Sequence, residues 1–340
     1  MGSVNRHHTN PPAFVEDFVW QLTQVPVAHL VSYRRTTFAD MNYLPKPASF
    51  QAPHSRGPLT HIPVFYTAAM VADSASFSPS AAKPAAVVNS WKMLGLPLKV
   101  IKPHPVTSDE IARAHDPVLV DGVLAGRLHN GFGNCSMEVA ASLNFTSGAM
   151  LSASREALRN GQVAVAPCSG FHHAHYDHCG GYCTFNGLMV AALALRAGNE
   201  VQRVGILDFD KHYGDGTNDI IKRLHIDWVT HFTAGQHYRT PDQAQSFLDH
   251  IPHILESMRN CDLVLYQAGA DPHVDDPLGG WLTTEQLFER DRRVFEAARA
   301  IGVPVAWNLA GGYQTPLRKV LDIHDNTMRA CGIYLTSAGS

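Results

Sequence analysis

Short apolar runs that alternate with helical segments constrain the fold of this 340-residue chain more than any other feature. Seven runs of four or five residues, rich in Val, Ile, Leu and Ala, have the length and composition of buried strands. Strands that are apolar on both faces are typical of parallel sheets covered by helices on both sides. The predicted strands are 62–66, 98–101, 163–167, 203–207, 228–232, 263–267 and 303–307.

Helical patterns fill the intervals between these runs. Residues 137–158 carry Met and Leu at helical spacing, and residues 188–195 are apolar all round, which indicates a sandwiched helix. Thr283-Thr-Glu-Gln286 is a capping box that opens a helix running towards Ala300. We therefore predict a single α/β domain over residues 61–340, with a mostly parallel multi-stranded sheet and helices on both faces.

Composition indicates where in the cell such a domain is located and which partners it has. Residues 1–60 are punctuated by Pro, His and Arg, and we predict an N-terminal extension there that contributes contacts to a homo-oligomer. The first residues lack the apolar core of a signal peptide, and six cysteines are too few for a disulfide scaffold, so we expect a cytoplasmic protein. A net charge of −3 and the lack of a long apolar run predict neither nucleic-acid nor membrane partners.

Polar and Gly-rich segments directly follow four of the predicted strands. Because the carboxyl ends of parallel strands meet at one edge of a sheet, these segments are expected to form one site. They are 170–173, 208–216, 269–273 and 310–313.

Three residues in these segments have the chemistry of metal ligands. Asp210 and His212 are two apart at a strand end, so in extended backbone their side chains project to the same side. Asp271 follows another strand and can supply a third ligand. Two carboxylates and one imidazole around Zn²⁺ leave open positions for water and substrate. We predict one Zn²⁺ per chain in a hydrolytic site.

The remaining polar residues of the segments suit proton transfer. His172 and His173 are adjacent, and Asp208 and Asp215 remain as their carboxylate partners. A carboxylate that is hydrogen-bonded to an imidazole fixes the tautomer of the ring and raises its basicity. Tyr313 follows a Gly-Gly pair and is a candidate donor to a developing oxyanion.

Four segments resemble, in order, the motifs of the histone deacetylase superfamily. The resemblance covers roughly residues 62–315 and is specific because all four motifs keep their order. The segments are GFHHAHYDHCGGYCTFN, LDFDKHYGDGT, AGADPHVDDPLGG and LAGGYQ.

The resemblance implies an arginase-like deacetylase fold and a role for each matched residue. It implies Zn²⁺ ligands at Asp210, His212 and Asp271, with His172 paired to Asp208 and His173 to Asp215. The second histidine would act as general base and then acid, the first would give electrostatic support, and Tyr313 would polarise the amide carbonyl. A channel for an acylated lysine-like chain and a structural K⁺ site are also implied. The channel residues are Gly181, Tyr182 and Leu278, and the K⁺ site comprises oxygens around Asp208, Asp210, His212, Thr230 and His231.

Departures from the family pattern bear on the substrate. Tyr182 stands where the family usually has a channel phenylalanine, and Tyr213 replaces the second histidine of the metal motif. Asn134, if aligned, replaces an Asp that holds the substrate backbone in many members, which weakens the case for a peptide. Leu278 replaces the Glu gatekeeper of polyamine-selective relatives. Acetyl-lysine, acetylpolyamines and other small acylamides all remain open.

Two alternative functions compete with a mononuclear zinc deacylase. A binuclear manganese ureohydrolase has a similar fold, but Gly214 and His273 stand where its bridging carboxylates would be. A non-catalytic sensor that binds an acyl ligand through its metal is the second alternative. Turnover with one metal per chain would distinguish the first hypothesis from both.

Overall fold

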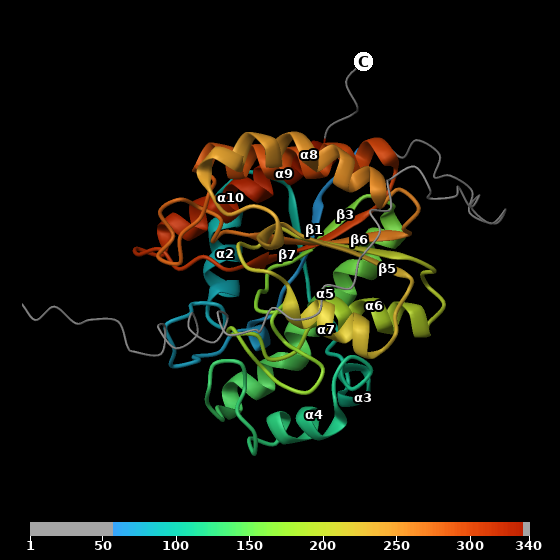
Figure 1. The fold of residues 1–340 in the computed structure, drawn as a ribbon, viewed down its shortest axis with the longest axis vertical. Helices are drawn as coiled ribbons and strands as arrows, with labels where there is room; N and C mark the ends of the chain where they lie inside the picture. The colour runs from blue at the N-terminus through green and yellow to red at the C-terminus, as the bar shows by residue number, and fades with distance from the viewer. Residues whose placement is uncertain (1–56, 336–340) are drawn as a thin grey trace, which may run out of the picture. The chain divides into compact units, whose positions relative to one another are not determined.

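Seven parallel strands form one sheet in the computed structural model, which describes residues 57–335 (Figure 1). Their order across the sheet is β2-β1-β3-β7-β6-β4-β5. Each predicted strand is confirmed, with ends that differ by at most three residues. The strands are β1 (Ile62–Phe65), β2 (Leu98–Ile101), β3 (Val163–Ala166), β4 (Val204–Asp208), β5 (Val229–Thr233), β6 (Leu263–Gly269) and β7 (Val305–Ala310).

Helices cover both faces of this sheet, as predicted, and each face has its own apolar core. Because side chains alternate along a strand, Val163 and Val165 of β3 pack into one core, whereas Ala164 and Ala166 pack into the other. The first core includes α2 (Lys83–Lys92), α8 (Ala244–Ser257), α9 (Thr284–Ile301) and α10 (Arg318–Cys331). The second includes α4 (Pro117–Leu124), α5 (Met137–Asn160), α6 (Gly187–Ala197) and Ile220 of α7 (Asp215–Arg223).

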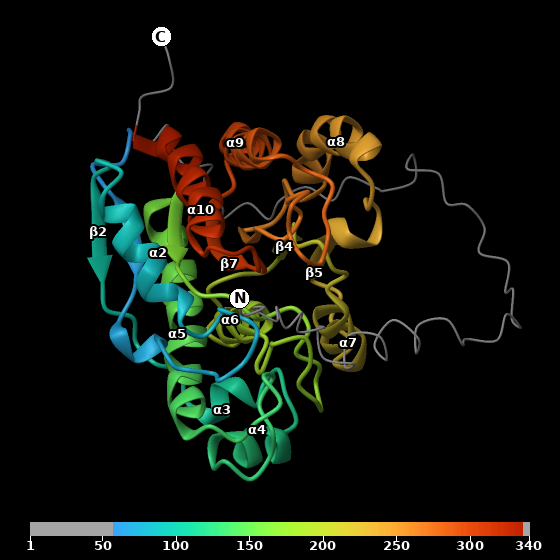
Figure 2. The same cartoon turned by 90° about the vertical axis from the view of Figure 1, so that its left-hand side faces the viewer.

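The three helices predicted from the sequence are α5, α6 and α9. The capping box of α9 is present, because the side chain of Thr283 accepts from the backbone of Gln286 and that of Gln286 reaches back to Thr283. Ser136 caps α5 at its start, and Gly161 ends it in the left-handed conformation that glycine adopts most readily. The other helices are additional to those predicted. One of them, α3 (Ser108–Ile111), lies with α4 at the end of the molecule away from α8 and α9 (Figures 1 and 2).

The predicted site lies where the loops after β3, β7, β6 and β4 leave the sheet, and these four strands are adjacent in it. Their carboxyl ends therefore bring the four polar segments to one edge. The predicted N-terminal extension lies, up to residue 56, outside the described residues. No helix within residues 57–335 is both long enough and apolar enough to cross a membrane.

Candidate active site

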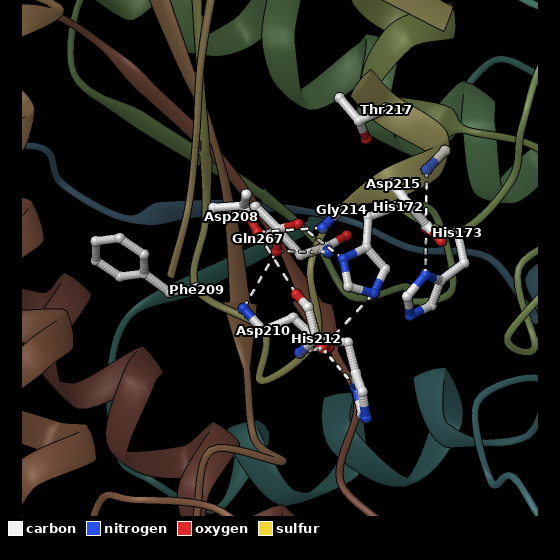
Figure 3. Close-up of polar contacts among 12 residues, drawn as sticks. His172, His173, Asp208, Phe209, Asp210, His212, Gly214, Asp215, Thr217 and Gln267 are labelled. Atoms are coloured by element: carbon white, nitrogen blue, oxygen red, sulfur yellow. Dashed lines mark hydrogen bonds and ion pairs between the residues drawn. The ribbon is translucent and has the colours of Figure 1, made fainter. Parts of the chain in front are cut away.

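Asp210, His212 and Asp271 converge at the carboxyl ends of β4 and β6. Figure 3 shows Asp210 and His212 beside the two adjacent histidines. One ligand atom from each lies within 4.8 Å of the others, and this is the only such group of three within residues 57–335. The Nδ1 atom of His212 lies 3.1 Å from Asp210 Oδ1 and 3.2 Å from Asp271 Oδ2. Both carboxylates are buried, and Oδ2 of Asp271 accepts no hydrogen bond. The structure therefore brings the predicted ligands together.

The backbone that carries two of these ligands differs from the prediction. Strand β4 ends at Asp208, and residues 210–212 form a bend rather than extended backbone. The expectation that two-residue spacing along a strand aligns Asp210 with His212 was therefore wrong. The backbone N–H of His212 donates to Asp210 Oδ1 at 2.9 Å, and that of Lys211 donates to Asp271 Oδ1 at 3.2 Å. Side-chain hydrogen bonds to the backbone fold this loop in place of strand geometry.

The electrostatics of the triad fit a divalent cation. Burial opposes charge on all three residues, yet attraction by Asp210 and Asp271 outweighs burial at His212 and raises its pKa to about 10. Burial and repulsion from Asp210 raise the pKa of Asp271 to about 6. Two buried carboxylates whose negative charge attracts a proton to a neighbouring group are also expected to attract a divalent cation. Oxygen and imidazole donors in this ratio suit Zn²⁺.

His172 forms a fully buried pair with Asp208. Its Nδ1–H donates to Asp208 Oδ2 at 2.7 Å, and its Nε2 lies 3.6 Å from Asp210 Oδ1. The other oxygen of Asp208 accepts from Gln267 Nε2 and from the backbone N–H of Asp210. Burial lowers the pKa of His172, but attraction by Asp208 and Asp210 outweighs it and raises that pKa to about 9. Without a metal ion, this imidazole is therefore charged at neutral pH.

His173 forms the second pair, with Asp215 at the first position of α7. Its Nδ1–H donates to Asp215 Oδ1 at 2.6 Å, which leaves Nε2 as an acceptor. The Asp215 side chain is 42% exposed, in contrast to the fully buried Asp208. Burial, followed by repulsion from His172, lowers the pKa of His173 below its ordinary value despite the attraction of Asp215. This imidazole is therefore neutral at neutral pH.

Tyr313 follows Gly311 and Gly312, which have φ values of +48° and +89° that glycine adopts without strain. The carboxylate of Asp276 accepts from the backbone N–H of Tyr313 at 2.8 Å, and buried Lys83 donates to the carbonyl of Gly311. Burial and the negative charges of Asp271 and Asp210 hold the pKa of Tyr313 well above its usual value. The phenol is therefore a hydrogen-bond donor at neutral pH.

The predicted channel residues lie beside this tyrosine. The ring of Tyr182 is 6.0 Å from that of Tyr313 and 6.1 Å from that of Phe132. Gly181 precedes it with a φ of +52°, and a Cβ at Gly181 would lie 2.4 Å from His173 Cδ2. The backbone N–H of Leu278 donates to Asp276 Oδ1. Asp276 thus holds the backbone of both Tyr313 and Leu278.

The residues of the predicted K⁺ site lie on two neighbouring strands. Thr230 and His231 belong to β5, and Gly205 and Ile206 of β4 are their register partners. A Cβ at Gly214 would lie 2.6 Å from Asp208 Oδ2 and 3.3 Å from His231 Nε2, so Asp208 and His231 both border Gly214. K⁺ binding stays a prediction.

Two residues outside the predicted set shape the site. Buried Arg290 of α9 donates to the carbonyl of Phe209 at 3.2 Å and to that of Gly269 at 2.6 Å, directly behind the ligand loops. His115 donates from Nδ1 to the carbonyl of His175 and accepts at Nε2 from the backbone of Asn186. The only signal in the sequence for Arg290 is a charge on the buried face of an amphipathic helix.

A third residue, Gln267, also escaped prediction, although a polar residue in an otherwise apolar strand marks its position. Its amide donates to Asp208 Oδ1 at 2.9 Å and so supports the buried His172–Asp208 pair (Figure 3).

Several proteins from other organisms are similar in sequence to part of this chain. An uncharacterized protein of Picosynechococcus sp. is 32% identical over 56% of this chain and 69% of its own length. A probable deacetylase of Methanothermobacter thermautotrophicus is 30% identical over 49% of this chain and 57% of its own length. An acetylpolyamine amidohydrolase of Burkholderia pseudomallei is 27% identical over 58% of this chain and 66% of its own length. The last two matches thus span less than two thirds of the relative.

A solved structure matches the fold of this chain, and a family model matches its sequence. The crystal structure of the HDA15 HD domain matches 83% of this chain and 90% of that domain with a TM-score of 0.66, at 19% identity, which shows a common fold. The family model described as the histone deacetylase domain matches residues 79–237 and 229–328. These matches span the metal triad, both His–Asp pairs and Tyr313, and the chain therefore belongs to the histone deacetylase family.

Proposed function

We propose that this protein is a zinc-dependent deacylase that hydrolyses a linear acyl amide to a carboxylate and an amine. One observation carries the proposal: a buried metal-ligand triad, two His–Asp pairs of opposite protonation tendency and a neutral tyrosine lie at one sheet edge. The family and its relatives named deacetylase and acetylpolyamine amidohydrolase support a hydrolase.

Each residue has a role that follows from its surroundings. A divalent ion held by Asp210, His212 and Asp271 would acidify a water molecule and polarise the acyl carbonyl. His173 is neutral, so its Nε2 accepts the proton of the attacking water and later returns it to the leaving amine. Tyr313 donates its hydroxyl proton to the oxygen on which negative charge develops.

The geometry favours one metal ion over the two of a ureohydrolase. Gly214 brings no carboxylate, and a Cβ there would already meet Asp208. His273 is engaged elsewhere, because its Nε2 lies 2.9 Å from Thr284 Oγ1 and its Nδ1 accepts from the backbone of Asp275. Neither position therefore supplies a bridging ligand.

The side chain of Asn134 favours a small acylated amine over a peptide. Its Oδ1 accepts from Asn130 Nδ2 and from the backbone of Ser136, and its Nδ2 donates to the carbonyl of Ser74. Both polar atoms of the side chain thus have partners within the protein, and it carries no charge to offer a peptide backbone. Acetylated polyamines and other small acylamides are therefore the first substrates to test.

Turnover of a graded panel tests the proposal. Zinc-loaded protein is assayed with small acylamides, acetylpolyamines and acetyl-lysine peptides, and metal content is measured alongside. We expect hydrolysis of at least one class, loss on chelation and recovery on adding zinc. The matched control is Tyr313→Phe, which should bind zinc normally and lose about two to three orders of magnitude in kcat. A folded protein with one zinc per chain that leaves the whole panel intact would contradict the proposal.

A further inference from the structure

Phe77 is an exposed aromatic residue that lies against the tyrosine of the site. It is 64% exposed, yet its ring stacks on that of Tyr313, with the centroids 5.8 Å apart and the planes 9° apart. Phe77 belongs to the loop 71–79 before α2, outside the four motifs. A single exposed phenylalanine is ordinary on a protein surface, but this one contacts the expected oxyanion donor.

Hydrogen bonds give this loop a defined conformation. The carbonyl of Ser74 accepts from Asn134 Nδ2 at 2.8 Å, and the buried hydroxyl of Ser78 donates to that of Ser80 at 2.9 Å. Between them, Ala75 has a φ of +47°, in the left-handed region that residues with a Cβ rarely adopt. Such a conformation persists only where the surroundings hold it. The loop therefore presents the phenyl ring to solvent in a fixed place.

Three more aromatic rings continue from Phe77 along the predicted channel. The ring of Tyr313 lies 6.0 Å from that of Tyr182, which in turn lies 6.1 Å from that of Phe132. Each of these four residues is at least partly exposed, and together we call them the aromatic wall. Stacked rings attract one another beyond the effect of burying their apolar area, so the wall suits a flat apolar group.

The charged groups beside the aromatic wall do not favour a cationic ligand. A Cβ at Gly279 would lie 3.7 Å from Lys211 Nζ, so this ammonium group lies next to the residue that follows Leu278. The carboxylate of Asp276 is buried, and its two oxygens accept from the backbone N–H groups of Leu278 and Tyr313. An ammonium group on a substrate would therefore meet the like charge of Lys211, whereas a neutral ring would not.

We propose that Phe77 is a specificity-determining residue, and that the aromatic wall binds acylamides whose amine portion carries a neutral aromatic group. This inference rests on the proposed function and names the substrate class within it. The ligand carboxylates are buried and Phe77 is exposed, so a substrate whose carbonyl reaches the triad extends outward past the wall. Contact with that outer portion is equal in the ground state and the transition state, so it sets KM rather than kcat.

Binding of three hydroxamates to zinc-loaded protein tests the inference without turnover. One probe carries a phenyl ring at the end of a linear alkyl chain, the second carries an amino group at the end of a chain of equal length, and the third is acetohydroxamate. Isothermal titration calorimetry should show that wild-type protein binds the phenyl-ended probe most tightly. We expect Phe77→Ala to weaken this probe by about three- to tenfold and to leave the other two within about twofold.

Two control variants separate the ring from other effects. Phe77→Tyr keeps an aromatic ring and should retain the affinity for the phenyl-ended probe. Val118→Ala truncates another exposed apolar side chain, which lies on α4, and should leave all three affinities unchanged. Gel filtration of each variant checks the oligomeric state. A change of that state in Phe77→Ala alone would assign the ring to a subunit interface and overturn the inference.

Steady-state kinetics give the second readout. For an N-(phenylalkyl)acetamide, Phe77→Ala should raise KM by about three- to tenfold with kcat unchanged. For a monoacetylated diamine, both constants should stay at their wild-type values. An equal loss of kcat for both substrates would show that Phe77 acts only by holding Tyr313, and it would overturn the proposed selectivity.

The binding and kinetic results distinguish two failures. If Phe77→Ala binds the phenyl-ended probe as tightly as wild type does, or if it weakens the amino-ended probe as much, the inference is wrong. If no probe binds to wild-type protein, the inference falls together with the metal site. If the phenyl-ended probe binds as expected but no acylamide is hydrolysed, the proposed function fails and the aromatic wall remains a binding site.

Discussion

The two His–Asp pairs of the site are built from adjacent histidines and differ mainly in where their carboxylates lie. Asp208 is buried at the end of β4 and accepts three hydrogen bonds, whereas Asp215 is 42% exposed at the start of α7. The pKa of His172 is raised to about 9 and that of His173 is lowered. Asp208 and Asp210 together favour charge on His172, whereas burial and repulsion from His172 disfavour charge on His173, a division that suits the electrostatic and base roles proposed for them.

Proximity reinforces this difference. The two imidazole rings lie 4.0 Å apart, so a charge on one disfavours a charge on the other. Asp210 lies near His172 Nε2 and adds to the attraction of Asp208 on that side. Asp215 lies at the N-terminus of α7, where the partial positive charge of the helix stabilises its carboxylate form. This carboxylate therefore depends less on a protonated His173 for its stabilisation.

The largest expected effect is on turnover. His173→Ala removes the neutral acceptor and should lower kcat by roughly 10²–10⁴-fold, while His172→Ala should lower it by a smaller factor. Both variants should retain one zinc, because neither histidine is in the ligand triad. Steady-state kinetics with parallel metal analysis measure both effects. A greater loss in His172→Ala would exchange the two assigned roles.

Stability should rank the pairs in the opposite order. Asp208→Asn leaves the buried imidazolium of His172 without its counter-charge and should lower the free energy of unfolding by roughly 3–5 kcal/mol. Asp215→Asn affects a half-exposed carboxylate, and we expect about 1 kcal/mol or less. Urea unfolding of metal-free protein measures both without interference from zinc loss. Equal costs would show that burial does not separate the pairs.

The loop that carries both histidines should weaken in acid because of His115. Burial lowers the pKa of His115 to about 4 from its ordinary value of 6.5, so the folded state requires the neutral ring. Its contribution is complete above pH 6.5 and is lost as pH falls towards 4, with a limit of about 3 kcal/mol. Urea unfolding at several pH values should show a shallower acid dependence in His115→Asn than in wild type. If the free energy of unfolding depended on pH in the same way in both proteins, His115 would not be the cause of the acid sensitivity.

The smallest expected effect is that of salt. Raising the ionic strength from about 0.1 M to about 1 M with NaCl, at constant KCl, shortens the Debye length from about 10 Å to about 3 Å. The difference in the His173 pKa between wild type and Asp215→Asn should shrink by roughly a few tenths of a unit, while the buried His172 keeps its value. Histidine NMR titrations at both ionic strengths test this. A salt response at His172 as large as that at His173 would contradict the contrast in burial.

The sheet and the grouping of Asp210, His212 and Asp271 could be predicted from sequence because both depend on local signals. Apolar runs such as 263–267 mark buried strands, and a carboxylate next to the end of a strand, such as Asp271, marks the functional edge. The bend at residues 210–212 could not be predicted, because it depends on hydrogen bonds that compete with extended backbone.

Long-range contacts limited the rest of the prediction. Arg290 reaches the carbonyl of Phe209, 81 residues away, and periodicity shows only that α9 has a buried face. The same holds for Asp276, whose carboxylate joins the backbone of Leu278 to that of Tyr313. The potassium site, the substrate and the N-terminal extension stay predictions.

The guanidinium of Arg290 has a consequence for ion selectivity. It donates to the carbonyls of Phe209 and Gly269, which precede Asp210 and Asp271 by one and two residues, so helix α9 connects the two ligand loops. The two loops are therefore connected by protein hydrogen bonds as well as by any ion that Asp210, His212 and Asp271 would hold. We expect a small ion to bind between the two loops without movement of the backbone. A larger ion such as Ca²⁺ has longer bonds to oxygen, so it would have to separate the loops against the buried hydrogen bonds of Arg290.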